Sequence, residues 1–150
     1  AGANVSATQS SNYTPIFYAT RIKKIEKILD LLIESGADIN FRGEKGLTPL
    51  IDMCLTQKIT EKRIKALLDR GADINAQEEE FGWSCLHFAV AEDDCKTAQI
   101  MINLGIDIEL TDNLGRTPLE IAGLNPKLNK KMLKILFEAG ANVDALENEG

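Results

Sequence analysis

The chain has 150 residues, of which 44% are hydrophobic, 27% are charged and only 5% are aromatic. This composition is typical of a soluble globular domain and argues against a disordered chain. The 17 basic and 23 acidic residues give a net charge of −6, and the apolar runs are too short to cross a bilayer. We therefore expect no nucleic-acid partner and no membrane association.

The cysteine and histidine content bears on compartment and chemistry. Cys54, Cys85 and Cys95 are odd in number and lack a CxxC spacing, so we expect reduced thiols in a cytoplasmic or nuclear compartment. His87 is the only histidine, and no metal-ligand, phosphate-loop or nucleophile–base motif accompanies it. We predict that the chain is not an enzyme and uses no cofactor or metal. A cysteine nucleophile with His87 as base is the alternative, which a thiol titration would test.

Two motifs recur in phase along the whole chain. A Gly-Ala-Asp-Ile-Asn-type motif begins at Gly2, Gly36, Gly71, Gly105 and Gly140. A Thr-Pro-Leu-type motif begins at Thr14, Thr48, Ser84 and Thr117. The steps are 34, 35, 34 and 35 residues for the first motif and 34, 36 and 33 for the second. This spacing predicts a repeat protein.

Each motif marks a helix boundary. A threonine caps a free backbone N–H, and a proline after it suits the first helical position, so the second motif begins a helix. A glycine after a run of residues such as 65–70 ends a helix in the left-handed conformation. The 21 to 23 residues between the two signals hold two short antiparallel helices. The stretch that follows holds a β-turn or hairpin with Gly46, Gly82 or Gly115 near its tip.

In this period and these motifs the chain resembles the ankyrin repeat family, whose unit is a β-turn and two helices of about 33 residues. Residues 84–89 carry the Thr-Pro-Leu-His-x-Ala-type start with Ser and Cys for Thr and Pro, and residues 117–122 carry it with Glu for His. The resemblance implies an all-α repeat solenoid, a stack of helix-turn-helix units with β-turn or hairpin loops, over the single domain 1–150. We expect a partial unit at 1–8, repeats at about 9–41, 42–76, 77–110 and 111–145, and the start of another turn at 146–150. Both ends stop within a unit, so we expect a fragment of a longer protein.

The repeats share apolar columns that should form one continuous core, because no repeat can bury its apolar face alone. The first helices contribute Ile16, Leu50, Leu86 and Leu119. The second helices contribute Leu32, Leu67, Met101 and Leu136, with Ile33, Leu68, Ile102 and Phe137 beside them. Asp52 and Met53 depart from the family's apolar and small residues, so the second repeat should pack less regularly. Pro126 should mark the turn between the two helices of the fourth repeat.

The resemblance also suggests roles for several polar side chains. It implies that His87 is a buried hydrogen-bonding bridge between adjacent loops. Cys54 and Cys95 fit small apolar helix positions, where free cysteine is commonly buried. Asn40 and Asn75 end Leu-x₅-Asp-Ile-Asn stretches, which are similar to ankyrin sites that asparaginyl hydroxylases modify. Whether either is hydroxylated does not follow from the sequence.

The acidic residues are concentrated around the third repeat. Residues 71–112 hold ten acidic residues against one base, Lys96, which gives this segment a net charge of −9. In an ankyrin-like stack the loop tips and the C-terminal ends of the first helices line one concave groove. The acidic clusters 78–80 and 92–94 should therefore face the same groove and attract a basic partner. The alternative is a solvated surface that only keeps the protein in solution.

Aromatic residues coincide with this acidic loop. Phe81 and Trp83 lie within it, and Tyr13 occupies the equivalent position in the first repeat. Exposed aromatic residues are typical interface anchors, although Trp83 could instead pack across to the neighbouring loop. With the corresponding positions of the other loops, the predicted partner-binding residues are Tyr13, Lys45, Leu47, Glu79, Glu80, Phe81, Trp83, Glu92, Asp93, Leu114 and Arg116.

These features predict a monomeric protein–protein interaction module. It would bind a partner protein or peptide, basic in character, through the concave groove and the loop tips. The alternative is a targeting or regulatory arm of a larger multidomain enzyme or of a host-directed effector, which would then act in the host cytosol. The repeat scaffold alone does not choose between these functions.

Overall fold

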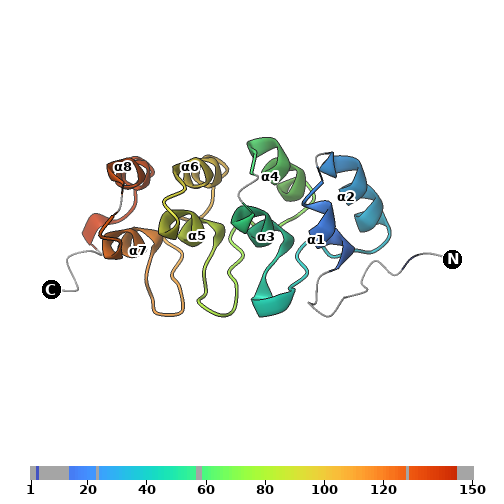
Figure 1. Cartoon of the computed structure of the whole chain (residues 1–150), viewed down its shortest axis with the longest axis horizontal. Helices are drawn as coiled ribbons and strands as arrows, with labels where there is room; N and C mark the ends of the chain where they lie inside the picture. Colours follow the sequence, from blue (N-terminus) through green and yellow to red (C-terminus); the bar gives the residue numbers. More distant parts are fainter. Residues whose placement is uncertain (1–2, 4–13, 23, 57–58, 128, 145–150) are drawn as a thin grey trace.

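The computed structural model describes residues 3, 14–22, 24–56, 59–127 and 129–144. Within these ranges the chain forms eight α-helices that pair into four helix-turn-helix units set in a row (Figure 1). The helices are α1 (Pro15–Ala19), α2 (Ile25–Glu34), α3 (Pro49–Leu55), α4 (Glu61–Leu68), α5 (Cys85–Ala91), α6 (Cys95–Asn103), α7 (Pro118–Leu124) and α8 (Lys130–Glu138). The predicted all-α repeat stack is confirmed. The partial units predicted at 1–8 and 146–150 lie outside the described residues, apart from residue 3.

The units have the same internal arrangement. The first helices α1, α3, α5 and α7 form one row, and the second helices α2, α4, α6 and α8 form another on top of it (Figure 1). The loops between units project from the first row, away from the second helices (Figure 1). One loop holds a short 3₁₀ helix, η1 (Glu44–Gly46), and another is closed by an antiparallel bridge between Gln77 and Ser84. The hairpin-like connections predicted from the glycines are therefore present.

The helix boundaries follow from the two sequence motifs. Thr48 Oγ1 accepts a hydrogen bond from the Ile51 N–H at 3.3 Å, and Pro49 occupies the first turn of α3. Thr117 and Glu120 form a reciprocal capping box at the start of α7. The glycines that follow the second helices have φ values of 92°, 90°, 90° and 91° at Gly36, Gly71, Gly105 and Gly140. This left-handed conformation ends each helix at little steric cost.

The core is a ribbon that runs along the stack. The predicted first-helix column, Ile16, Leu50, Leu86 and Leu119, is buried throughout. In the second helices Leu67, Met101 and Leu136 are buried, whereas Leu32 is only half-buried. In the column beside them, Ile33, Leu68 and Ile102 are half-buried, whereas Phe137 is 44% exposed. These departures lie in α2 and α8, the first and the last of the second helices that the structure describes.

The second repeat accommodates its unusual acid by pairing it with a base. Asp52 is buried in α3, and Arg21 Nη2 lies 3.5 Å from each of its carboxylate oxygens. The neighbouring Met53 is buried as well. A cation from the preceding repeat therefore compensates the charge that burial would otherwise make costly. Pro126 lies between α7 and α8, as predicted.

Candidate functional site

Hydrogen bonds join adjacent loops into a continuous strip. Arg42 Nη1 donates to Gln77 O at 2.9 Å, and Gln77 Nε2 in turn donates to Thr111 O of the next loop at 2.7 Å. Nearer the tips, Phe81 O accepts from the Asn113 N–H at 2.8 Å. The loops therefore hold one another in place, and the side chains at their tips project from a fixed base.

A buried glutamate organises the loop of the third repeat. Glu78 is only 4% exposed; its Oε1 accepts from the N–H groups of Phe81 and Trp83 at 2.8 and 3.0 Å, and its Oε2 accepts from Glu80 N–H at 2.7 Å. In the fourth repeat Asp112 takes the equivalent place, with one residue fewer before the helix motif. The extra methylene of glutamate spans the longer loop. Glu78 is thus part of the loop scaffold, and the expectation that it belongs to an exposed acidic cluster is wrong.

The predicted contact residues of the fourth loop have different environments. Arg116 is bound by its own loop: its Nε and Nη2 donate to Asp112 Oδ2 at 2.9 and 2.7 Å. Burial alone would raise the pKa of Asp112, but the hydrogen bonds from Arg116 and Leu114 hold it below its usual value. Leu114 is 75% exposed at the loop tip. Arg116 therefore stabilises the loop, whereas Leu114 is open to contact.

The second loop is tied to the third through its lysine. Lys45 Nζ lies 2.7 Å from Glu80 Oε2, and this hydrogen-bonded ion pair raises the pKa of Lys45. Glu79 donates its N–H to Lys45 O at 2.8 Å, and its side chain is exposed. Leu47 is half-buried against the core. Tyr13, the contact predicted in the first loop, lies outside the described residues.

Three aromatic side chains form a row from the loop tip to α5. Phe81 is 50% exposed at the tip, and its ring centroid lies 5.5 Å from that of Trp83. Trp83 in turn meets Phe88 of α5 edge-on, with centroids 5.1 Å apart and an interplanar angle of 74°. Trp83 Nε1 donates to Asp112 Oδ2 at 3.4 Å, so this residue packs toward the neighbouring loop while Phe81 remains open. We refer to Phe81, Trp83 and Phe88 as the aromatic row.

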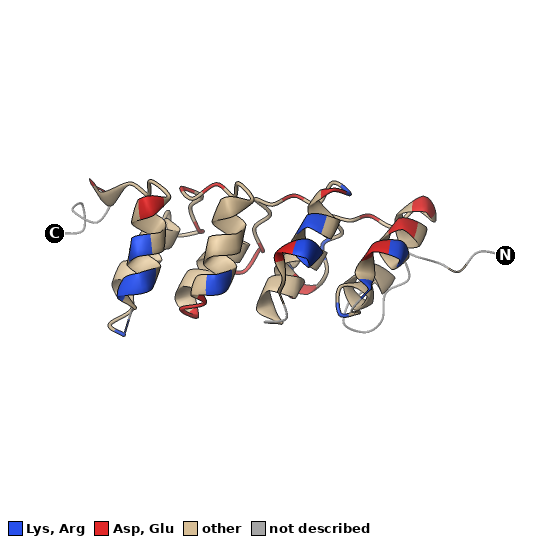
Figure 2. Cartoon of the chain, turned by 90° about the horizontal axis from the view of Figure 1, so that it is seen from above, with Lys and Arg blue, Asp and Glu red and all other residues tan. Residues whose placement is uncertain are grey.

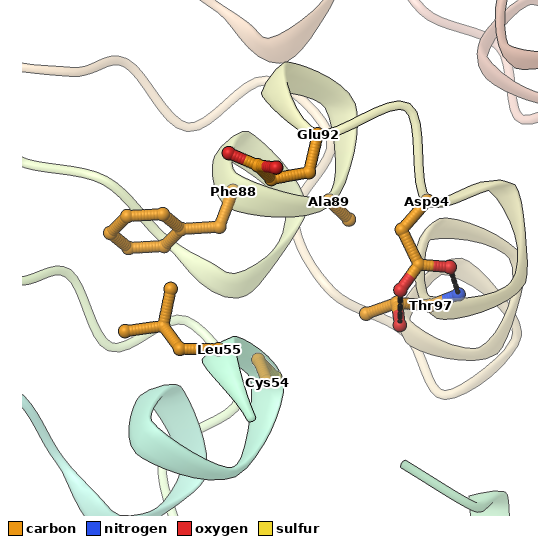
Figure 3. A pocket seen from close by; sticks show the side chains of 7 residues that line it. All are labelled: Cys54, Leu55, Phe88, Ala89, Glu92, Asp94 and Thr97. Carbon is orange, nitrogen blue, oxygen red and sulfur yellow. Dashed lines mark hydrogen bonds between the residues drawn. The ribbon is translucent and has the colours of Figure 1, made fainter. Parts of the chain in front are cut away.

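The aromatic row ends at a cleft between the C-terminal end of α3 and α5 (Figure 3). The cleft has a volume of about 270 Å³ and is lined by Cys54, Leu55, Phe88, Ala89, Glu92, Asp94 and Thr97. Leu55 and the ring of Phe88 lie opposite each other, and the side chain of Glu92 extends from the end of α5 on the Phe88 side (Figure 3). Sequence reasoning missed Leu55 and Phe88, because their proximity depends on how two repeats pack.

The three acids of the 92–94 cluster lie in different environments. Asp94 caps α6, since it accepts from Thr97 N–H at 3.0 Å and from Thr97 Oγ1 at 2.5 Å. Asp93 adopts a left-handed backbone with φ 54°, and its carboxylate is 4.0 Å from Cys95 Sγ. Glu92 is exposed and makes no side-chain hydrogen bond or ion pair with any residue that the structure describes. Glu92 is therefore the acid of this cluster whose carboxylate is available to a ligand.

His87 has the bridging role that the resemblance implies. The Ser84 N–H donates to His87 Nδ1 at 3.1 Å, so the neutral ring carries its proton on Nε2, which faces Arg116 O at 3.3 Å. Burial lowers the pKa of His87, which favours this neutral form. The ring thus connects the start of α5 to the loop of the next repeat, and its hydrogen-bonding capacity is used within the scaffold.

Two of the three thiols lie in environments that disfavour the reactive thiolate. Cys54 and Cys85 are buried and Cys95 is half-buried, and burial raises the pKa values of Cys54 and Cys95. Protonated thiols are poor nucleophiles and poor metal ligands. In the described ranges, His, Cys, Asp and Glu form no group of three or more that could hold a metal ion. No helix in the described part of the chain is long and apolar enough to cross a membrane.

The two asparagines singled out by the resemblance connect neighbouring repeats. Asn40 Oδ1 accepts from the Asp73 N–H at 2.8 Å, and Asn75 Oδ1 accepts from the Asp107 N–H at 2.8 Å. Asn40 also donates through Nδ2 to Gly71 O at 2.9 Å. Both amides thus contribute to the stacking of the repeats.

The fold and this surface define a helical repeat protein that presents loops and first helices along one side. Residues 55–147 match the family described as ankyrin repeats (3 copies), and residues 11–44 match the ankyrin repeat. The chain therefore belongs to the ankyrin repeat family. Ankyrin repeats are in general modules for protein–protein interaction.

The chain is similar to parts of larger proteins. It is 31% identical over 137 residues to an ankyrin repeat protein of Fowlpox virus, which covers 89% of this chain and 39% of the relative. It is 30% identical over 146 residues to the nuclear factor NF-kappa-B p105 subunit of Gallus gallus, covering 95% of this chain and 14% of the relative. It is 37% identical over 68 residues to the 2-5A-dependent ribonuclease of Mus musculus, and this match covers 45% of this chain and 9% of the relative. The chain spans less than half the length of each of these relatives.

Proposed function

We propose that this chain is a module that binds a basic partner protein or peptide along the concave side formed by its loop tips and first helices. The aromatic row of the third repeat, together with the acids beside it, forms the main contact. One observation supports this proposal above all. The aromatic row runs from an exposed loop tip to a cleft where Glu92 has no basic partner among the described residues.

The chemistry of this surface suits a basic partner with apolar anchors. Phe81 and Leu114 are exposed on adjacent loops and supply apolar area at the tips. The acidic segment 71–112 supplies a negative charge, part of which Lys45 and Arg116 neutralise at Glu80 and Asp112. The remaining charge raises the rate of association with a cation. Lys and Arg recur along α4 and α8, whereas α6, which lies between them, carries only Lys96 (Figure 2). Lys96 lies on the outer row of helices, and the loop and first helix of the third repeat, residues 77–94, contain no lysine or arginine that would repel a basic ligand.

A peptide-display selection on the intact chain, followed by calorimetry of a selected peptide, tests the proposal. Phe81→Ala removes an exposed ring and leaves the buried part of the loop in place. We expect this change to weaken binding by about tenfold or more, as for an interface anchor. The matched control is Leu31→Ala, which truncates an exposed leucine on α2 and should change the affinity by less than about twofold.

The salt dependence of the same binding provides a second readout. If the acids of the third repeat contribute, the affinity falls as the salt concentration rises, because screening weakens exposed charge pairs. A selected peptide whose affinity is insensitive both to salt and to Phe81→Ala would contradict the proposal.

A second candidate function is supported by the partial coverage of the relatives. The chain spans 39%, 14% and 9% of the three larger proteins described above. We propose on this ground that it serves as the targeting or regulatory arm of a larger enzyme or effector, with the chemistry located outside these residues. The arm would be monomeric and would act in the cytoplasm or nucleus, or in the host cytosol for a secreted effector. An open reading frame that starts and stops close to these ends would refute this candidate.

A further inference from the structure

We propose that the cleft between α3 and α5 is a subsite for one arginine side chain of the partner. The guanidinium would lie beside Glu92 and Phe88, and its aliphatic stem would lie between Leu55 and Phe88. This inference rests on the proposed function and deepens it, because it names the residue that the binding surface recognises.

The size of the cleft selects a single side chain. Its volume of about 270 Å³ is below the roughly 300–1,000 Å³ of sites that take drug-sized ligands. The buried Cys54 and Ala89 form its inner end, and Leu55 and Phe88 form facing apolar walls (Figure 3). The cleft therefore has room for one long side chain and is smaller than a site for a drug-sized ligand.

The walls of the cleft suit an aliphatic stem with a planar cationic head. Long basic side chains bury their methylene groups against apolar surface while the head stays near water. Phe88 is held by its edge-on contact with Trp83 at 5.1 Å, and a ring that is already fixed loses little entropy on binding. A guanidinium stacks on such a ring and also pairs with a carboxylate through two N–H groups.

The charges around the cleft favour a cation. Glu92 has no side-chain partner among the described residues, and Asp94 on the other side carries a carboxylate that only Thr97 engages. No lysine or arginine is among the residues that line the cleft. An acidic side chain would be repelled, and an apolar one would desolvate Glu92 without compensation. An arginine side chain can contact the apolar walls with its stem and the acidic side chains with its guanidinium.

Arginine is favoured over lysine by the geometry of the pair. The ammonium of lysine is a compact, strongly hydrated charge that does not stack on a ring as a flat guanidinium does. In this cleft the cation must contact an aromatic wall and a carboxylate from the same helix, α5. A planar head with several donors meets both at once.

Peptides selected on the intact chain provide the test. We expect enrichment of arginine at one position and then compare, by calorimetry, the selected peptide with versions that carry lysine or citrulline there. Citrulline keeps the shape and removes the charge. Each replacement should weaken binding to the wild-type chain by about tenfold. Lysine binding within about twofold of arginine would overturn the assignment.

Protein variants locate the contact. Glu92→Gln, on an exposed side chain, should weaken binding of the arginine peptide by about tenfold and leave the citrulline peptide unchanged. Glu34→Gln removes the same charge from the exposed end of α2 and should have no effect beyond about twofold. Phe88→Leu should lower the preference for arginine over lysine, with a thermal melt as the folding control.

The outcomes separate this inference from the proposed function. If selected peptides depend on Phe81 but not on arginine or Glu92, the arginine subsite is refuted and the binding module stands. If no peptide binds, both are refuted.

Discussion

The loop of the third repeat depends on one buried carboxylate, and its removal makes a sharp prediction. Glu78 accepts three backbone hydrogen bonds, at 2.7, 2.8 and 3.0 Å, and is 4% exposed. Its neighbour Glu79 is exposed, and its carboxylate makes no hydrogen bond with another described residue. Glu78→Ala and Glu79→Ala therefore remove the same chemical group from adjacent positions with opposite environments.

The expected loss of stability follows from the three hydrogen bonds that Glu78 accepts. A hydrogen bond to a charged group contributes about 1.5–3 kcal/mol, but part of this is regained because water can reach N–H groups in a loop that opens. We expect Glu78→Ala to lower the free energy of unfolding by about 2–4 kcal/mol. Glu79→Ala should change it by less than about 0.5 kcal/mol, as is usual for an exposed residue.

Urea unfolding measures both variants. Circular dichroism at helical wavelengths follows the whole stack, and the fluorescence of Trp83, the only tryptophan, follows the loop itself. Since Glu78 accepts from the Trp83 N–H at 3.0 Å, the emission of native Glu78→Ala should already shift toward that of exposed tryptophan. Equal free energies of unfolding for the two variants would refute the role assigned to Glu78.

Three further predictions concern the scaffold. Leu86→Ala should lower the free energy of unfolding by about 2–5 kcal/mol, because Leu86 is fully buried. The control, Leu31→Ala, should have little effect. Equal losses of unfolding free energy for the two variants, measured by urea unfolding, would contradict the core assignment. Asp112→Asn should cost about 1–3 kcal/mol because it weakens the bonds to Arg116 at 2.7 and 2.9 Å, and an unchanged urea midpoint would disprove this. Burial lowers the folded-state pKa of His87 below its ordinary 6.5, so the unfolded chain takes up the proton more readily. The stability that this residue contributes is present above pH 6.5 and is lost as the pH falls through that value and below. A melting temperature that stays constant from pH 8 to pH 5 would be inconsistent with this. The same pH dependence of the melting temperature in the wild-type chain and in His87→Gln would also be inconsistent with it.

The architecture could be predicted from the sequence because its signals are local and repeated. Thr48 with Pro49 and the glycine at Gly36 act within one turn of the chain, although the equivalent Thr14 begins α1 without a side-chain cap hydrogen bond. The buried first-helix column follows from the same period, since equivalent positions meet equivalent neighbours. Phe137 departs from this rule: it is 44% exposed on α8, the last helix that the structure describes, where no further repeat is described to cover it.

The candidate site was predicted less completely because it depends on contacts between repeats. Glu78 and Glu79 are identical and adjacent, and only the path of the loop decides which of them turns inward. Phe88 is one of several apolar residues in α5, and its place at the end of the aromatic row depends on the packing of Trp83 and Leu55. The sequence contained one usable signal: the extra residue in this loop relative to the fourth repeat.

Amide chemical-shift mapping of the isotopically labelled chain with a selected peptide tests the binding surface most directly. The largest shifts should occur at Phe81, Phe88, Glu92 and Leu114, on the side of the loops and first helices. Shifts concentrated instead on the outer helices α4, α6 and α8 would show that the partner binds the opposite side of the stack.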